Sequence, residues 1–246
     1  MAQRIADRGR CAVAELAETY RVTTETVRRD LSTLEHLGLV RRVHGGAVPA
    51  GTLRVIESGV ADRDRTNAAE KEAIARAALR YLPGPGSTVL LDAGTTTSRL
   101  AQLLPQQHGL SVVTHAVDVA AQLTGRGGVD LHLLPGRVRE TTHAAVGAAT
   151  VAALGTLRAD LAVVGTNGIS AGHGLSTPDT DEAAVKRAMV RSARQVVVLA
   201  DSSKVGRETA VRFATLDEVD VLVTDAGVEA AARSALDEAG LEVVTA

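Results

Sequence analysis

The chain of 246 residues has very few aromatic residues and a single cysteine. Its aromatic side chains are Tyr20, Tyr81 and Phe213, which are too few for the stacking platforms that hold single-stranded nucleic acid. The lone Cys11 excludes an intrachain disulfide and suits a reducing cytoplasm, so we expect it to be a small buried apolar residue. The cores must therefore be built from valine, leucine, isoleucine and alanine.

Several kinds of motif are also missing. No apolar run approaches the length of a membrane span, and the N-terminus lacks the apolar core of a signal peptide, so we expect no membrane association. We find no Cys/His spacing typical of zinc, no Walker loop and no GxGxxG after a predicted strand, and we expect neither a metal nor a cofactor. Lysine is scarce too: the chain has 24 arginines but only Lys71, Lys186 and Lys204.

The first 50 residues contain the most informative pattern. Residues 13–20 place apolar side chains at helical spacing, and Arg21-Val22 forms a turn before a second helix over about 24–36. Thr23 is a plausible N-cap for the second helix, and Gly38 ends it. We expect its buried stripe to consist of Val27, Leu31, Leu34 and Leu37.

The other face of this second helix carries groups that reach base edges and phosphates in duplex DNA, namely Thr24, Thr26, Arg28, Arg29 and Ser32. A strand over 39–43 and a turn at His44-Gly45-Gly46 follow, and we expect Arg41, Arg42 and His44 to meet the DNA backbone or minor groove. The pattern predicts a winged helix-turn-helix. An ordinary helical hairpin with a charged, solvated face is the alternative.

Charge is distributed in the direction that DNA binding requires. Residues 1–54 hold nine arginines against six acidic residues, a net charge of +3, whereas the remainder holds 18 basic and 23 acidic residues, a net charge of −5. The asymmetry supports a DNA-binding domain over residues 1–50, but it is too small to establish one.

The rest of the sequence predicts a linker over residues 51–62 and an α/β domain over residues 63–246. Residues 63–82 predict a polar entry followed by a helix, which ends at Pro83-Gly84-Pro85-Gly86. Apolar strand candidates then alternate with helices over 96–104, 117–124, 145–157, 180–193 and 227–239. The strand candidates are 87–91, 110–114, 130–134, 160–164, 195–200, 219–223 and 241–245. Short β-branched runs suit buried parallel strands, whose carboxyl ends form the ligand crevice in such sheets.

Polar residues follow these strands. After the first strand, Asp92-Ala93-Gly94-Thr95-Thr96-Thr97 leads into a helix whose free N–H groups suit a phosphate. The alternative is a helix start capped by Thr95 or Thr96, with no ligand. Later strand ends add His115, Arg139, Asn167 and Lys204, and Glu182 follows a glycine-rich loop over 168–178. This mixture of cations, amide and carboxylate suits a polyol phosphate.

Two of these residues have open alternatives. Lys204 is a lysine in an arginine-rich chain, which indicates a need for a compact point charge, although a solvated loop lysine is the alternative. His115 either donates to a phosphate when protonated or packs in the core.

The sequences VTTETVRRDL and LGLVRRVHGGA resemble the DeoR family of bacterial transcriptional regulators. The resemblance covers nearly the whole chain. It implies a winged helix-turn-helix joined to a larger Rossmann-like α/β domain that resembles sugar-phosphate isomerases and binds a phosphorylated sugar. It also implies a phosphate loop of Asp92, Gly94, Thr95, Thr96 and Thr97, with Arg139, Glu182 and Lys204 completing the site.

Three features depart from the family pattern. Only eight residues precede Gly9-Arg10, where the family usually has a longer first helix, so either the start lies too far downstream or the head packs less well. Thr114-His115 stands where Thr-Asn is common, and Pro135-Gly136 where Gly-Gly is common. These two changes concern the identity of the effector, whereas the expected fold is unaffected.

Three functions follow as hypotheses. The first is a homodimeric or homotetrameric repressor of a carbohydrate-utilisation operon, which binds a double-stranded operator and responds to a phosphorylated sugar. The second is a sugar-phosphate isomerase-like enzyme with an accessory DNA-binding head, in which Asp92, Glu182 and Lys204 supply acid–base chemistry. The third is an architectural DNA binder that ignores small molecules.

Overall fold

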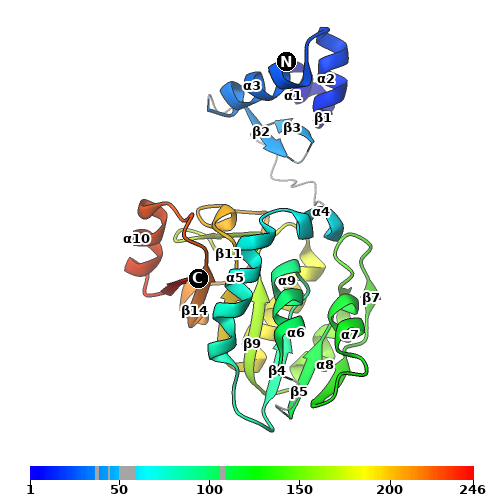
Figure 1. Ribbon diagram of the computed structural model, residues 1–246, viewed down its shortest axis with the longest axis vertical. Coiled ribbons are helices and arrows are strands. Elements are labelled where there is room, and N and C mark those ends of the chain that lie inside the picture. The colour runs from blue at the N-terminus through cyan, green and yellow to red at the C-terminus, as the bar shows by residue number, and fades with distance from the viewer. Residues whose placement is uncertain (37–38, 44, 50–58, 106–108) are drawn as a thin grey trace. The chain divides into compact units, whose positions relative to one another are not determined.

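A computed structural model describes residues 1–36, 39–43, 45–49, 59–105 and 109–246 (Figure 1). The chain divides into two compact units, Met1–Ile56 and Glu57–Ala246. Of the predicted linker, residues 51–58 lie outside the described residues, and its last residues, 60–62, begin a helix. Within the described residues, no helix combines the length and apolar character that crossing a membrane requires.

The first unit is a small α/β head. Its elements are α1 (Ala2–Arg8), β1 (Cys11–Ala12), α2 (Val13–Tyr20), α3 (Thr24–His36), β2 (Val40–Val43) and β3 (Gly46–Pro49). The strands form an antiparallel sheet in the order β1-β3-β2. The two helices predicted over 13–20 and 24–36 are confirmed, and they pack on this sheet as a winged helix-turn-helix does.

The head has its own apolar core, in which Ile5, Cys11, Leu16, Val27 and Leu31 are all buried. The expectation that Cys11 is a small buried apolar residue is therefore confirmed. The wing sheet is packed so closely that a Cβ on Gly46 would lie 2.2 Å from the Cys11 carbonyl oxygen, so this position requires glycine.

The second unit is built on a seven-stranded parallel sheet in the order β15-β14-β12-β9-β4-β5-β6. The seven strands predicted from the sequence are confirmed as β4 (Thr88–Leu91), β5 (Leu110–Thr114), β6 (Val129–Leu133), β9 (Ala159–Gly165), β12 (Ala193–Leu199), β14 (Val221–Thr224) and β15 (Glu242–Thr245).

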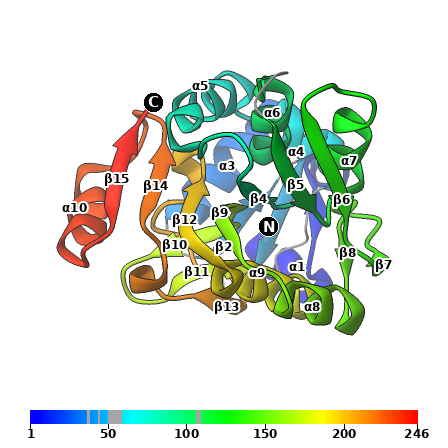
Figure 2. The same cartoon turned by 90° about the horizontal axis from the view of Figure 1, so that it is seen from below.

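Helices cover both faces of this sheet (Figure 2). They are α5 (Ala68–Ala78), α6 (Thr95–Leu103), α7 (Val117–Leu123), α8 (Ala148–Gly155), α9 (Thr180–Ser192) and α10 (Ala230–Glu238). Successive strand residues point to opposite faces, so Val89 and Leu91 join the core under α5–α7, whereas Leu90 joins the core under α8–α10. Burial on both faces explains why these strands are continuous apolar runs.

One local prediction is refined by the structure and another was wrong. The polar entry and helix predicted over 63–82 correspond to the end of α4 (Val60–Arg65), α5 and the 3₁₀ turn η1 (Leu79–Tyr81), and Asn67 adopts a left-handed backbone (φ 53°) that separates α4 from α5. The predicted loop over 168–178 contains β10 (Gly168–Ser170) and β11 (Gly174–Thr177), which pair with each other, and β11 also pairs with β13 (Val211–Ala214). Strand β13 is distant from β11 in sequence, so no local pattern reveals that these two strands pair.

The direction of strand addition reverses between β4 and β9. From β4 the chain builds β5 and β6 on one side, and from β9 it builds β12, β14 and β15 on the other. The carboxyl ends of strands at such a switch point are where open α/β sheets bind ligands. Asp92 follows β4 and Gly165 ends β9, so both lie at this point.

Candidate DNA-binding face and candidate ligand site

Helix α3 has the amphipathic character that the sequence predicts. Val27 and Leu31 are buried in the head core. Of the residues predicted to face DNA on this helix, Thr24, Thr26, Arg28 and Arg29 are exposed, as is Thr23 just before it, whereas Ser32 is half-buried. The hydroxyl and guanidinium groups of this helix thus point to solvent, where they can contact the base edges and phosphates of DNA.

The start of α3 is fixed by Thr23. Its hydroxyl accepts a hydrogen bond from the backbone N–H of Thr26 (3.2 Å), as predicted for an N-cap, and lies 2.9 Å from the Thr26 hydroxyl. Arg28 pairs with Glu25 one turn earlier at 3.3 Å. Both partners are exposed, so the pair contributes little to stability and Arg28 can exchange Glu25 for a phosphate.

The wing strand β2 is attached to α3 through Arg42. Its backbone N–H donates to Glu35 Oε1 (2.8 Å), and its guanidinium donates to Ser32 Oγ (2.5 Å). Arg41 is half-buried and, as its neighbour in a strand, points to the opposite face. The side chains of Arg41 and Arg42 therefore cannot both contact DNA from one face of β2. His44, which was also predicted to contact DNA, lies outside the described residues.

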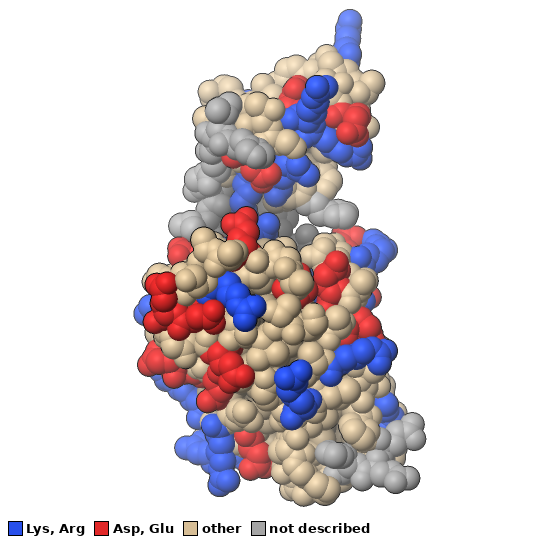
Figure 3. Space-filling model, turned by 60° about the vertical axis from the view of Figure 1, so that its left-hand side comes forward, with Lys and Arg blue, Asp and Glu red and all other residues tan. Residues whose placement is uncertain are grey.

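Surface charge does not mark a DNA-binding face by itself. Figure 3 shows basic and acidic side chains interspersed on the visible side of each unit. The identity and placement of the α3 side chains are therefore more informative than net charge.

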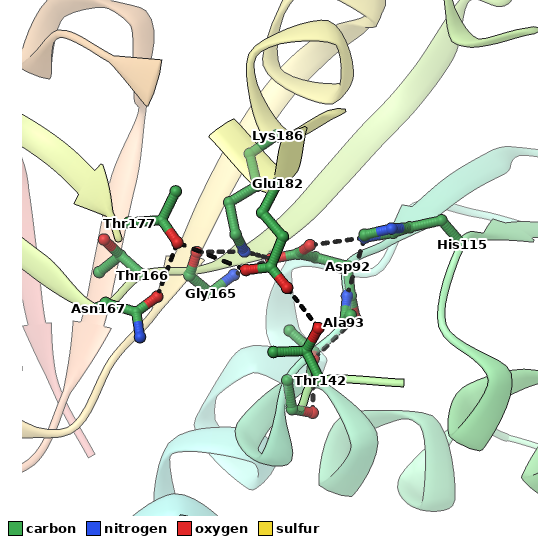
Figure 4. Close-up of polar contacts among 12 residues, drawn as sticks. Asp92, Ala93, His115, Thr142, Gly165, Thr166, Asn167, Thr177, Glu182 and Lys186 are labelled. Carbon is green, nitrogen blue, oxygen red and sulfur yellow. Dashed lines mark hydrogen bonds and ion pairs between the residues drawn. The ribbon is translucent and has the colours of Figure 1, made fainter. Parts of the chain in front are cut away.

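Asp92 is the centre of the candidate ligand site in the second unit (Figure 4). Its side chain is completely buried, and Oδ2 accepts a hydrogen bond from the Gly165 N–H (2.7 Å) and contacts the Lys186 ammonium. Burial alone raises the pKa of this carboxyl, but the charge of Lys186 and the contact with His115 outweigh burial and lower the pKa to about 2. Asp92 therefore joins β4, β9 and α9 at the switch point.

His115 is buried against the same carboxylate. Its Nδ1 lies 2.9 Å from the Ala145 carbonyl oxygen, which only accepts, so Nδ1 carries a proton. Its Nε2 lies 2.9 Å from Asp92 Oδ1 and 3.2 Å from the Ala93 backbone nitrogen. Both ring nitrogens have partners within the protein, which favours the packing alternative over donation to a phosphate.

Glu182 lies one turn before Lys186 on α9 and organises a second group of contacts. Its Oε1 accepts hydrogen bonds from Arg139 (2.5 Å) and from the Thr142 hydroxyl. Burial raises the pKa of Glu182, but Lys186, Thr142 and Arg139 together lower it below its ordinary value. The Glu182 carboxyl is thus ionised and paired on the inner side of α9.

Asn167 borders the same group through Thr177. The Thr177 hydroxyl lies 3.1 Å from Asn167 Oδ1 and 3.4 Å from Glu182 Oε2. It has one proton, so it donates to one of these oxygens at a time. Among the predicted residues, the fold therefore gathers Asp92, His115, Arg139, Asn167 and Glu182 around the switch point.

The threonine loop starts α6 with buried residues, since Thr95, Thr96 and Thr97 are all largely removed from solvent. The N-cap is Gly94, with no side-chain cap, so the alternative in which Thr95 or Thr96 caps the helix is wrong. The Thr97 hydroxyl is used inside the loop, where it donates to the Asp92 and Gly94 carbonyls (2.8 and 2.9 Å). An uncapped first turn retains the positive end of the helix dipole for an anion.

Lys204 belongs to a different group from the other predicted residues. It lies in the 3₁₀ turn η2 (Ser202–Lys204), is half-buried and interacts with Asp201. The lysine that reaches Asp92 is Lys186, which sequence reasoning missed together with Thr142 and Thr177. The scarcity of lysine was an available signal for Lys186, and its spacing of one helical turn from Glu182 was another.

Comparison with known families gives two matches along the chain. Residues 1–51 match the DeoR-like helix-turn-helix domain, and residues 66–226 match the DeoR C-terminal sensor domain.

Among characterised proteins, the chain is 36% identical over 233 residues to the HTH-type transcriptional regulator GlpR of Haloferax volcanii, covering 95% of this chain and 90% of that protein. It is 33% identical over 223 residues to the glycerol-3-phosphate regulon repressor of Escherichia coli K12, covering 90% of this chain and 87% of the relative.

Among solved structures, the full-length sorbitol operon regulator SorC from Klebsiella pneumoniae has a TM-score of 0.46 and 14% identity, covering 96% of both chains. Ribose 5-phosphate isomerase A from Methanocaldococcus jannaschii has a TM-score of 0.42 and 15% identity, covering 56% of this chain and 55% of the isomerase.

Proposed function

Since this chain belongs to the DeoR family of transcriptional regulators, we propose that it represses a carbohydrate-utilisation operon and responds to a phosphorylated sugar. The observation that carries the proposal is a pair of matched domains in one chain, a DNA-binding head and a sensor. We assign residues 1–50 to the head, 51–62 to a linker and 63–246 to a sensor that also forms the oligomer, and we assign the protein to the cytoplasm.

We assign DNA recognition to α3 and the wing. Thr24, Thr26, Arg28 and Arg29 are placed to reach base edges and phosphates in the major groove. Thr23 fixes the helix start, and Arg41, Arg42 and His44 belong to the wing that follows the backbone or minor groove.

The test uses a duplex selected from a random-sequence pool with the full-length protein. Arg28→Ala and Arg29→Ala should each weaken binding of this duplex by about 1–3 kcal/mol if the side chain contacts a base. A phosphate contact should instead lower the slope of log K against log salt by about 1. Glu18→Ala on α2, an exposed residue outside the predicted face, is the control. Unchanged binding by both arginine variants in a mobility-shift titration contradicts the assignment.

We assign the effector to the switch point of the sensor. The α6 N-terminus, with Gly94, Thr95 and Thr96, and the Lys204 ammonium would hold the phosphate. Arg139, Asn167 and Glu182 would contact the sugar hydroxyls. Asp92, His115 and Thr97 make buried contacts within the protein. We therefore assign them the role of positioning the residues that contact the phosphate and the sugar. The relative named as a glycerol-3-phosphate regulon repressor supports a small phosphorylated polyol as the ligand class.

A thermal-shift screen of phosphorylated sugars tests this assignment. A ligand present at one hundred times its dissociation constant adds about 2.7 kcal/mol to the free energy of unfolding. Thr96→Val should reduce this effect, because the variant removes one hydroxyl at the start of α6. The absence of a shift with every pentose, hexose and triose phosphate would support the architectural DNA binder instead.

The electrostatics argue against the isomerase hypothesis. A general base works best with a pKa near the operating pH. The pKa of Asp92 is lowered to about 2 and that of Glu182 is also lowered, because both carboxylates are paired with cations. A coupled assay that detects isomerisation of ribose 5-phosphate would overturn this inference.

We propose a homodimer or homotetramer that contacts itself at the edge strand β6. Leu133 on β6 and Val138 on the neighbouring β7 (Arg137–Val138) are more than half exposed. Two copies of β6 paired antiparallel about Leu131 would place Asp130 opposite His132, whose ring N–H can donate a hydrogen bond to the carboxylate. Light scattering should give a multiple of 25.4 kDa, and Leu133→Glu should reduce it.

A further inference from the structure

Four cationic side chains gather near the start of α6, and we name them the cation cluster: Arg63, Lys71, Arg99 and Lys204. Lys71 is buried (5% exposed), and burial, together with the nearby charges of Lys204, Arg63 and Arg99, lowers its pKa to about 8 against the opposing effect of Asp201. The Asp64 carboxylate pairs with Arg99, and the Asp201 carboxylate interacts electrostatically with Lys204 and Lys71. Ammonium and guanidinium groups that lie close together in this way suit a phosphate dianion.

The cation cluster borders the α6 N-terminus, to which the proposed function assigns the phosphate. Arg99 lies one turn into α6, and its Nη1 donates to the Thr95 carbonyl oxygen (3.2 Å). Its side chain is 14% exposed, so this guanidinium is largely removed from water. A phosphate at the first turn of α6 would therefore lie close to Arg99.

The same cations hold α4 in place. Arg99 pairs with the Asp64 carboxylate and donates to the Asp64 carbonyl oxygen (3.1 Å). Lys71 donates to the Arg63 carbonyl oxygen and to the Thr66 carbonyl oxygen (2.7 Å). No residue of α4 is buried, so these polar contacts, with little help from apolar burial, attach the helix to the sensor.

The next residues of the chain add one more contact. The Asn67 amide donates to Asp201 Oδ1 (2.9 Å), which ties the α4–α5 junction to the end of β12. Figure 1 shows α4 beside the ends of α5 and α6. In sequence, α4 is the first described helix after residues 50–58, which join the two units, so any change at α4 has a covalent route to the head.

We propose that a phosphate bound at the cation cluster takes Arg99 away from Asp64 and so releases α4, which passes effector occupancy to the DNA-binding head. This inference rests on the proposed function and names the regulation of the same site. A phosphate dianion competes well, because its oxygens accept paired hydrogen bonds from a guanidinium. The Asp64 side chain is half-exposed, so its own attraction for Arg99 is partly screened by water.

The test compares two isosteric variants on α4 in the full-length protein. Asp64→Asn removes the competing carboxylate while Arg99 stays intact. Asp62→Asn is the matched control, because Asp62 pairs with the exposed Arg65 (2.6 Å) and not with the cation cluster. Both variants remove one negative charge from the same helix.

Hydrogen exchange of the α4 amides is the first measurement, with inorganic phosphate as the probe and chloride at matched ionic strength as the control. In the native protein, phosphate should raise exchange of the hydrogen-bonded amides over 63–66 by a factor on the order of ten. Asp64→Asn should exchange fast without phosphate, and Asp62→Asn should behave like the native protein. Phosphate should also bind Asp64→Asn more tightly, because the coupling is reciprocal.

Operator binding is the second measurement, made with the selected duplex and the sugar phosphate that gives the largest thermal shift. Asp64→Asn should bind the duplex weakly without the sugar phosphate and respond to it less than Asp62→Asn does. If the sugar phosphate weakens DNA binding while α4 exchange stays constant, the inference is overturned and the proposed function stands. The inference is also overturned if Asp64→Asn and Asp62→Asn exchange alike. If phosphate accelerates α4 exchange but no sugar phosphate affects DNA binding, release of α4 is supported and effector control of the operator fails.

Discussion

Replacing Lys186 by methionine should destabilise the sensor strongly. The substitution keeps a long unbranched side chain, which can still pack beside the Phe213 ring, 5.6 Å from the Lys186 ammonium. It removes the cation that pairs with the completely buried Asp92 and the donor to the Gly165 carbonyl oxygen (3.0 Å). Breaking a buried ion pair by removing one partner costs about 3–5 kcal/mol, because it leaves an uncompensated buried charge.

The assay is urea unfolding followed by far-ultraviolet circular dichroism, since the chain has no tryptophan. The double variant Asp92→Asn/Lys186→Met removes both charges, so it should recover about half of the lost free energy of unfolding or more. A loss below about 1 kcal/mol for Lys186→Met would refute the reasoning. A double variant that is no more stable than the single variant would refute it as well.

The same ion pair predicts how stability depends on pH. The pKa of Asp92 is about 2 in the folded protein and 3.8 as an ordinary value. A depressed folded pKa stabilises the protein above the unfolded pKa, so this contribution is present above pH 3.8 and is lost as the pH falls towards 2. The difference corresponds to about 2 kcal/mol. Asp92→Asn should therefore lose less stability than the native protein across this pH range.

Two further substitutions test local packing. Gly46→Ala should destabilise the head by about 1–3 kcal/mol, because its Cβ would overlap the Cys11 carbonyl oxygen; Gly45→Ala, whose Cβ meets open space but whose φ is 74°, separates overlap from backbone strain, and equal losses would contradict the overlap argument. Thr97→Val should cost about 1–2 kcal/mol, because it removes the hydroxyl that donates to Asp92 and Gly94 while the shape is kept; calorimetry measures it, and an unchanged melting temperature contradicts it.

Local periodicity predicted most of the elements for identifiable reasons. The seven sheet strands were found because burial on both faces requires continuous apolar runs, such as Val196-Val197-Val198-Leu199. Helix α3 was found because its core face and its polar face alternate at helical spacing. The β10–β11–β13 sheet was missed, since strands of three or four residues with glycines have no pattern of their own and depend on a distant partner.

The candidate site was predicted in part, because sequence shows which residues follow a strand but not what their side chains contact. Asp92, Glu182 and Arg139 were found at the ends of elements, and the structure brings them together with Lys186. Lys186 lies in the second turn of α9, away from any strand end, so the rule that found the others did not apply to it. Lys204 obeyed that rule, yet it lies in the cation cluster and interacts with Asp201.

The order of amino acids by itself determined the two domains, the polar side of α3 and the core strands, because each depends on spacing between neighbours along the chain. Only the tertiary structure decided that Asp92 pairs with Lys186, 94 positions away, and that Arg99 reaches back to Asp64 on α4. Ion pairing depends on distance in space and on removal from water, and neither quantity is encoded at a fixed separation in the sequence.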